Sequence, residues 1–358
     1  MPHRGGQKLY LHVGYRKTGS SFLQSLFAIN SGYLQQCGIY YPISRNALRR
    51  ASSLHTTTGN IDLKRFAQQL PETQKAANGS DVLLSSELAF EEIRKNSCAI
   101  DVCRNIFDVV DIILLIRNPV EHFISDYIQD VKVGGGIETL DEAFEAVNFT
   151  PPILRQTIEF LDNCISAGVN LSVYSYDIER NRLAQTFAQK LQLCFENLSI
   201  PHKRVNRGLT FFEVESARVI NAAFGRKIGA AFCEALIHQK PSTAQETSTP
   251  IAPSRNSHAK IIDHISPQVD ALKQKLIAAG AGDLPLDWDL GKALNAEITR
   301  SNEQVPTSEL SRLQEIELTD EVLRRFSGKR LAQESARRFL NKVYSHDMRR
   351  FFFPLRKS

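Results

Sequence analysis

The residues best suited to chemistry lie in a short loop at positions 14–21, which reads Gly-Tyr-Arg-Lys-Thr-Gly-Ser-Ser. The loop follows an apolar segment and precedes a stretch of helical periodicity. A strand, a glycine-bounded loop and a helix in this order direct backbone N–H groups and the positive end of a helix dipole to one place. The sequence therefore predicts an anion site. We expect its contacts to come from Arg16, Lys17, Thr18, Gly19, Ser20 and Ser21.

The position of the lysine narrows the chemistry of this loop. Gly14 and Gly19 have four residues between them, as in a Walker A loop, but Ser20 stands where a nucleotide triphosphatase needs lysine. The lysine of this chain, Lys17, lies inside the loop. A kinase or ATPase uses its lysine together with Mg²⁺ on a highly charged γ-phosphoryl group, whereas a transferring sulfuryl group carries less charge and needs no metal. The alternative is a structural strand–turn–helix junction with chance glycines.

A second chemical group follows the most strongly apolar run of the chain, residues 109–116. Arg117 comes directly after that run, where open α/β sheets bind their ligands. Its guanidinium can bind a phosphate through two parallel hydrogen bonds. Ser125 lies eight residues further on, inside a helix opened by Pro119, and would face the same pocket. The alternative is an exposed ion pair between Arg117 and Glu121.

Both segments resemble signature blocks of sulfotransferases that use 3'-phosphoadenosine 5'-phosphosulfate (PAPS). Residues 12–21 are similar to the phosphosulfate-binding loop, residues 23–42 to its continuation in bacterial members, and residues 117–127 to the 3'-phosphate block. The resemblance covers roughly residues 8–215. It implies a P-loop-like sulfotransferase fold, PAPS as co-substrate without a metal, Lys17 at the departing phosphate, and Arg117 with Ser125 on the 3'-phosphate. One position departs from the pattern, because members often carry Arg where this chain has His122.

Transfer to a hydroxyl also requires a group that accepts the proton of the acceptor. Glu87 follows the predicted strand 82–84 and resembles the strand-end Glu that is the base in the carbohydrate-sulfating branch of the family. Burial in a cleft would raise the pKa of such a carboxyl towards neutrality. The alternative is a helix-capping or surface carboxylate. His55 is the rival base, since histidine titrates in the right range.

The elements that must position these residues alternate between strands and helices. Short apolar segments predict strands at 9–13, 39–41, 82–84, 109–116 and 171–174. Helical periodicity predicts helices at 21–36, 61–78, 119–131, 140–147 and 152–166, with a flexible loop at 134–136. Beyond about residue 210 the pattern predicts only helices, near 211–237, 258–279, 318–326 and 330–345, and an exposed loop at 240–256. The prediction is an α/β fold with a parallel sheet flanked by helices, residues 1–215, and a helical part, residues 216–358, packed on this core.

Composition places the chain among ordinary globular proteins, with 42% hydrophobic and 23% charged residues. Residues 324–358 hold 11 Lys and Arg against 2 Asp and Glu, a net charge of +9; since the whole chain carries +5, residues 1–323 carry −4. The basic character therefore belongs to the tail, and the core gives no sign of binding nucleic acid. The amphipathic basic stretch 332–343 could contact an anionic membrane or dock its apolar stripe on the core.

The targeting and cysteine patterns predict a cytoplasmic protein. No apolar run approaches the ~20 residues that span a bilayer, and residues 1–8 lack a secretory signal pattern. The six cysteines form no CxxC pair, so we expect buried or half-buried thiols in a reducing compartment.

The sequence as a whole favours an enzyme that moves a sulfuryl group from PAPS to a hydroxyl by in-line transfer. The expected acceptor is a carbohydrate or glycoconjugate, with Glu87 as the base. Two alternatives stay open: a P-loop kinase or nucleotidase, and a catalytically degenerate sulfotransferase-fold protein that only binds. The oligomeric state is left open.

Overall fold

The computed structural model describes residues 6–44, 48, 59–61, 65–201, 209–238, 251–284, 286 and 288. These residues form two compact units. The first, here called the sheet unit, takes its described residues from 1–122, 150–205 and 264–288. The second, the helical unit, takes its described residues from 123–149 and 206–263. The boundary expected at residue 215 stays a prediction.

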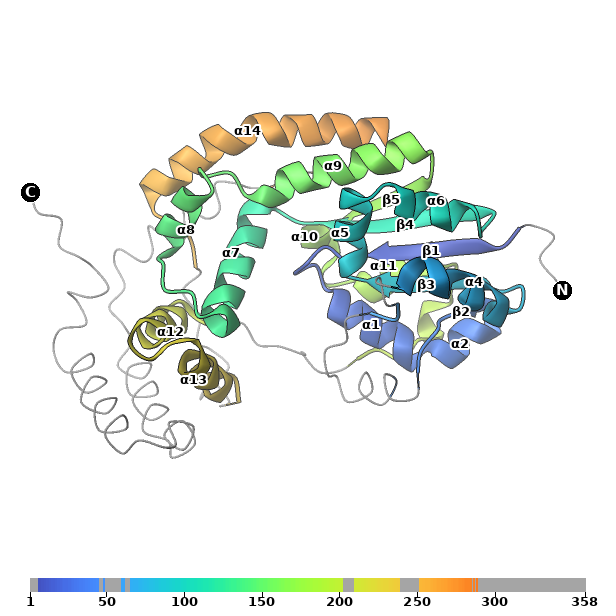
Figure 1. Cartoon of the computed structure of the whole chain (residues 1–358), viewed down its shortest axis with the longest axis horizontal. Helices are drawn as coiled ribbons and strands as arrows, with labels where there is room; N and C mark the ends of the chain where they lie inside the picture. The colour runs from blue at the N-terminus through green and yellow to red at the C-terminus, as the bar shows by residue number, and fades with distance from the viewer. Residues whose placement is uncertain are drawn as a thin grey trace, which may run out of the picture. The chain divides into compact units, whose positions relative to one another are not determined.

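A five-stranded parallel sheet forms the centre of the sheet unit (Figure 1). Its strands are β1 (Lys8–Val13), β2 (Ile39–Tyr40), β3 (Asp81–Ser86), β4 (Val109–Ile116) and β5 (Asn170–Ser175), in the spatial order β2-β3-β1-β4-β5. Val13 pairs with Ser86 on one side and with Leu114 on the other, so the carboxyl ends of the three central strands meet at one edge. The predicted strands and the α/β class with a parallel sheet flanked by helices are confirmed.

Helices cover both faces of the sheet, which explains why its central strands are almost continuously apolar. One face, carrying Tyr10, Leu83 and Ile113, packs against α1 (Ser20–Ile29), α2 (Ser31–Gln36) and α11 (Leu183–Lys190). The opposite face is covered by α5 (Leu88–Lys95), α6 (Cys98–Arg104) and α9 (Pro152–Ala167) (Figure 1). Among its described residues, the sheet unit also contains α4 (Phe66–Ala77), the short α10 (Tyr176–Glu179) and the 3-10 turn Phe195–Asn197.

The division between the units falls within two helices. α7 (Pro119–Gln129) begins in the sheet unit, and α14 (Arg255–Ala278) begins in the helical unit. Within the sheet unit, Lys275 of α14 forms an ion pair with Asp162 of α9. The other elements of the helical unit are the π-helical turn η2 (Asp130–Gly134), α8 (Leu140–Ala146), α12 (Phe211–Phe224) and α13 (Arg226–His238).

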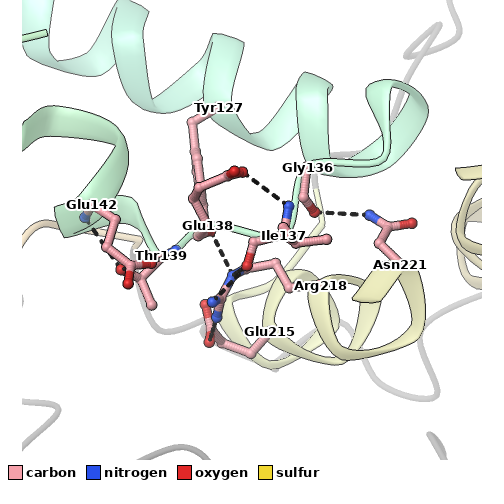
Figure 2. A network of polar contacts seen from close by, with 9 residues as sticks. All are labelled: Tyr127, Gly136, Ile137, Glu138, Thr139, Glu142, Glu215, Arg218 and Asn221. Atoms are coloured by element: carbon pink, nitrogen blue, oxygen red, sulfur yellow. Dashed lines mark hydrogen bonds and ion pairs between the residues drawn. The ribbon is translucent and has the colours of Figure 1, made fainter. Parts of the chain in front are cut away.

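Side chains of α12 hold residues 136–138, which begin in the glycine-rich segment 134–136 predicted as a flexible loop (Figure 2). Arg218 donates to the carbonyl oxygens of Ile137 and Glu138 at 2.9 and 2.6 Å. Asn221 donates to the carbonyl oxygens of Val131 and Gly136 at 2.8 and 3.0 Å. These contacts were not predicted, because the partners lie about 80 residues away in sequence and local composition cannot reveal them.

Two predicted helices are each divided in the structure. The stretch 21–36 divides at Asn30, whose side-chain amide donates to the carbonyls of Leu26 and Ser199, both at 2.8 Å. The stretch 211–237 divides at Gly225, which has a φ of 80°. α6 and α11 were not predicted, and a helix at α5 was considered only through the capping alternative for Glu87. The helices expected at 318–326 and 330–345 lie outside the described residues.

Surface predictions were only partly right. Cys103, Cys164 and Cys233 are buried, but Cys37, Cys98 and Cys194 are exposed, contrary to the expectation of shielded thiols. Most of the loop expected at 240–256 lies outside the described residues, and within it Ala252 is buried. In the part of the chain that the structure describes, no helix is both long and apolar enough to cross a membrane.

Candidate functional site

The loop after β1 begins with a close backbone approach at Gly14. Its N–H donates to the carbonyl of Ser86, the last residue of β3, at 3.0 Å. A Cβ atom at this position would lie 2.6 Å from Oγ of Ser20 and 2.9 Å from Cα of Glu87. Only glycine fits there. This glycine therefore lets the start of the loop, the first residue of α1 and Glu87 come together.

The loop is held in a left-handed conformation at two positions. Lys17 has a φ of 62°, which is uncommon outside glycine, and Gly19 has a φ of 81°. The carbonyl of Tyr15 accepts a hydrogen bond from the buried Thr18 hydroxyl at 2.6 Å, which closes the turn. Left-handed residues of this kind cluster at ligand-binding loops.

Helix α1 begins where the loop ends. Its first helical hydrogen bond runs from the Leu23 N–H to the Gly19 carbonyl at 3.1 Å. The N–H groups of Ser20 and Ser21 come before that bond, at the helix end that binds anions. The strand, loop and helix follow one another as predicted, and the binding of an anion there stays a prediction.

Replacement of Gly19 by alanine tests the geometry of the loop. A Cβ there would lie 2.8 Å from Leu183 and 3.1 Å from the Tyr176 ring, and the left-handed backbone costs a side chain about 1–2 kcal/mol. We expect Gly19→Ala to lower the free energy of unfolding in urea by at least about 1 kcal/mol. Gly32→Ala in α2 is the control, because no atom lies within 4 Å and a helical alanine should be neutral or stabilising. Equal stability of the two variants would show that the loop geometry is wrong.

Arg117 follows β4 directly and reaches the loop. Its Nη1 donates to the carbonyl oxygen of Lys17 at 3.2 Å, so the two predicted donor-binding residues are in contact. Its Nη2 pairs with Glu121 at 3.1 Å. The ion pair considered as an alternative therefore exists, and it coexists with the contact to the loop.

Two residues of this site were missed from the sequence. Tyr176 and Asp177 follow β5 directly. The Tyr176 ring lies 5.6 Å from the Arg117 guanidinium carbon. Asp177 accepts a hydrogen bond from the Asn118 N–H at 2.7 Å, and its other oxygen lies 3.7 Å from Nε of Arg117. The sequence could have indicated both residues, because they follow a predicted strand and the carboxyl ends of parallel strands lie on the same side of a sheet.

Glu87 follows β3 and precedes α5. Its side chain makes no capping hydrogen bond; the Ser86 hydroxyl accepts from the Leu88 N–H instead, at 3.3 Å. Burial raises the pKa of Glu87, and the positive charges of Lys17 and Arg16 partly offset this shift. The capping alternative is therefore not supported, and Glu87 lies within electrostatic range of the two loop cations.

The end of β3 that presents Glu87 is braced from the side. β2 pairs only with the first two residues of β3, so the later residues of β3 need other hydrogen-bond partners on the side that faces β2. The side-chain amide of Asn60 accepts from the Ser85 N–H at 2.8 Å and donates to the Leu83 carbonyl at 3.1 Å. On this side of β3, the side chain of Asn60 thus makes the hydrogen bonds that a neighbouring strand would make.

His12 and His122 are packing residues of the sheet unit. His12 is fully buried, bonds Ser85 through Nδ1 at 2.8 Å, and has its pKa lowered to about 3 by burial. His122 is 4% exposed and packs edge-to-face on Tyr15, with ring centroids 4.9 Å apart. His122 therefore lies beneath the loop.

Two predicted site residues stay predictions. His55 lies outside the described residues. Ser125 lies in α7 beyond the boundary between the units, and its contact with the 3'-phosphate is untested. Among the residues that the structure describes, no group of three or more His, Cys, Asp or Glu side chains could hold a metal ion.

Comparison with known proteins assigns the chain to no family. No protein family matches the chain, and no curated protein matches it. Among solved structures, the chain is similar to a sulfotransferase from Alicyclobacillus acidocaldarius, with 16% identity and a TM-score of 0.34 over 65% of this chain and 96% of that one. A likeness of this size leaves the function to the residues of the site.

Proposed function

We propose that this chain is a sulfotransferase that moves a sulfuryl group from PAPS to a hydroxyl. The observation that carries the proposal is the meeting of three strand ends: the loop after β1, Glu87 after β3 and Arg117 after β4. The reaction needs an anion-binding loop, a carboxyl with a raised pKa and a guanidinium. Residues of all three kinds follow the carboxyl ends of these neighbouring strands.

The loop and Arg117 would bind the two ends of the donor. The 5'-phosphosulfate would lie against the N–H groups that open α1, with Lys17 beside its bridging oxygen. Arg117 would bind the 3'-phosphate. Because ATP lacks a 3'-phosphate, this second contact would select PAPS over ATP.

The proposed transfer is a single in-line displacement. The acceptor oxygen forms a bond to sulfur while the bond from sulfur to the bridging oxygen breaks, and its electron pair leaves with adenosine 3',5'-bisphosphate. Lys17 stabilises the negative charge that develops on this leaving group. Glu87 takes the acceptor proton, for which burial of a carboxyl is suited because it raises the pKa towards neutrality. No metal takes part in the proposed step.

The acceptor proposed is a carbohydrate or glycoconjugate hydroxyl, since the position of Glu87 directly after β3 resembles that of the base in the carbohydrate-sulfating branch. A P-loop kinase is disfavoured because Ser20 stands where its lysine is needed. A protein that only binds nucleotide would need no carboxyl of raised pKa at the loop.

A transfer assay tests the proposal. The protein is incubated with sulfur-labelled PAPS and a panel of sugar, lipid, small-alcohol and tyrosine-peptide acceptors, without added metal. We expect label to reach a sugar hydroxyl, and Lys17→Ala to reduce the rate about 10²- to 10³-fold. Transfer that is unaffected by Lys17→Ala would remove the loop from the mechanism, and the absence of both transfer and bisphosphate binding would reject the function.

A further inference from the structure

The guanidinium of Arg117 is shared between two carboxylates that differ in how firmly they are held. Asp177 is fixed by the Asn118 N–H at 2.7 Å and lies 3.7 Å from Nε of Arg117. Glu121 holds Nη2 at 3.1 Å from the first turn of α7, and its side chain is 45% exposed. The two carboxylates therefore contact different nitrogens of Arg117. Asp177 is held by a backbone hydrogen bond, whereas the side chain of Glu121 is partly exposed to solvent.

A phosphate that uses the two parallel N–H groups of this guanidinium competes with one of these carboxylates. Glu121 is the weaker competitor. Its carboxylate is 45% exposed, so water solvates Glu121 well once it leaves the guanidinium, and the pair holds it weakly. Asp177 in contrast also binds the backbone after β4, so its departure would leave the Asn118 N–H without its acceptor.

We propose that Glu121 competes with the donor's 3'-phosphate for Arg117, while Asp177 keeps the guanidinium in position during the exchange. This inference rests on the proposed function. Glu121 then lowers the affinity for every nucleotide with a 3'-phosphate. The by-product adenosine 3',5'-bisphosphate keeps that phosphate, so the same competition favours its release, a step that often limits turnover.

The geometry predicts opposite effects for the two matched carboxylate-to-amide variants. Glu121→Gln removes the competing charge, and we expect it to bind adenosine 3',5'-bisphosphate about 2- to 10-fold more tightly. Asp177→Asn keeps an acceptor for the Asn118 N–H but loses the charge that holds Nε of Arg117, and we expect weaker binding. Glu159→Gln is the control, because Glu159 is similarly exposed at 42% and, on α9, pairs with Arg155 at i,i+4 and with Arg94 of α5, not with Arg117. It should leave the affinity unchanged.

Isothermal titration of the full chain and its variants with adenosine 3',5'-bisphosphate and with 5'-AMP tests the proposal. Glu121→Gln should gain affinity only for the bisphosphate, which separates competition at Arg117 from a general change in the fold. An unchanged or weaker bisphosphate affinity of Glu121→Gln, an equal gain for 5'-AMP, or a gain in Asp177→Asn would each overturn the inference. If the wild-type protein does not bind adenosine 3',5'-bisphosphate, both the proposed function and this inference are rejected. If it does bind, the variants test only the competition by Glu121.

Discussion

Replacement of Glu87 by glutamine is expected to lower the rate of sulfuryl transfer by about 10²- to 10⁴-fold. The amide keeps the size of the side chain against Gly14 but cannot accept the acceptor proton. Donor affinity should change little, since the donor's phosphates contact the loop and Arg117. Steady-state kinetics with saturating PAPS measures the effect, with Glu92→Gln in α5, the helix that follows Glu87, as the control. A Glu87→Gln enzyme with the wild-type rate would mean that another group is the base.

The raised pKa of Glu87 gives this variant two pH signatures. A base acts when ionised, so the wild-type rate should rise with pH through the raised pKa, and this limb should be missing in Glu87→Gln. The folded chain also binds the Glu87 proton more tightly than the unfolded chain does. The contribution of Glu87 to the free energy of unfolding therefore falls as pH rises from the ordinary range of glutamate through its folded pKa. At neutral pH, Glu87→Gln should be at least as stable as the wild type in thermal unfolding.

Replacement of Arg117 by lysine or methionine is expected to weaken the binding of adenosine 3',5'-bisphosphate by about 30-fold or more, which corresponds to about 2 kcal/mol. Lysine keeps the charge but loses the parallel N–H pair, so even this conservative change should cost most of the effect. The affinity for 5'-AMP should change little, which titration calorimetry of both ligands can measure. Wild-type selectivity for the 3'-phosphate in both variants would contradict the role of Arg117.

Arg117 also donates to the Lys17 carbonyl, so the variants need a control for the loop itself. Arg155→Lys on α9 removes a guanidinium from an i,i+4 pair with Glu159 and should leave both affinities unchanged. Thermal unfolding of the Arg117 variants shows whether they remain folded. Loss of 5'-AMP binding in parallel with the bisphosphate would point to a disturbed loop.

Local signals in the sequence were enough to predict the centre of the sheet and the loop. The apolar segments 9–13 and 109–116 are each followed by polar or glycine residues, and such transitions mark strand ends without any knowledge of the fold. Because parallel strands share one edge, Lys17, Glu87 and Arg117 could be expected to meet, and the structure places them together at that edge.

The residues that sequence could not supply depend on distant partners. Asp177 becomes part of the site only because β5 pairs with β4, which brings it to the Asn118 N–H 59 positions away. Asn60 acts on the end of β3 because β2 is too short to cover that edge. Neither effect leaves a periodic pattern, since each depends on one side chain meeting a backbone group of another segment.

The most direct measurement of the central claim is the nucleotide preference of the wild-type protein, determined by calorimetric titration. The proposed function predicts that adenosine 3',5'-bisphosphate binds more tightly than 5'-AMP by about 30-fold or more, without added metal. Binding of ATP that requires Mg²⁺, with no preference for the 3'-phosphate, would contradict the function and identify the loop at residues 14–21 as a nucleotide triphosphate site.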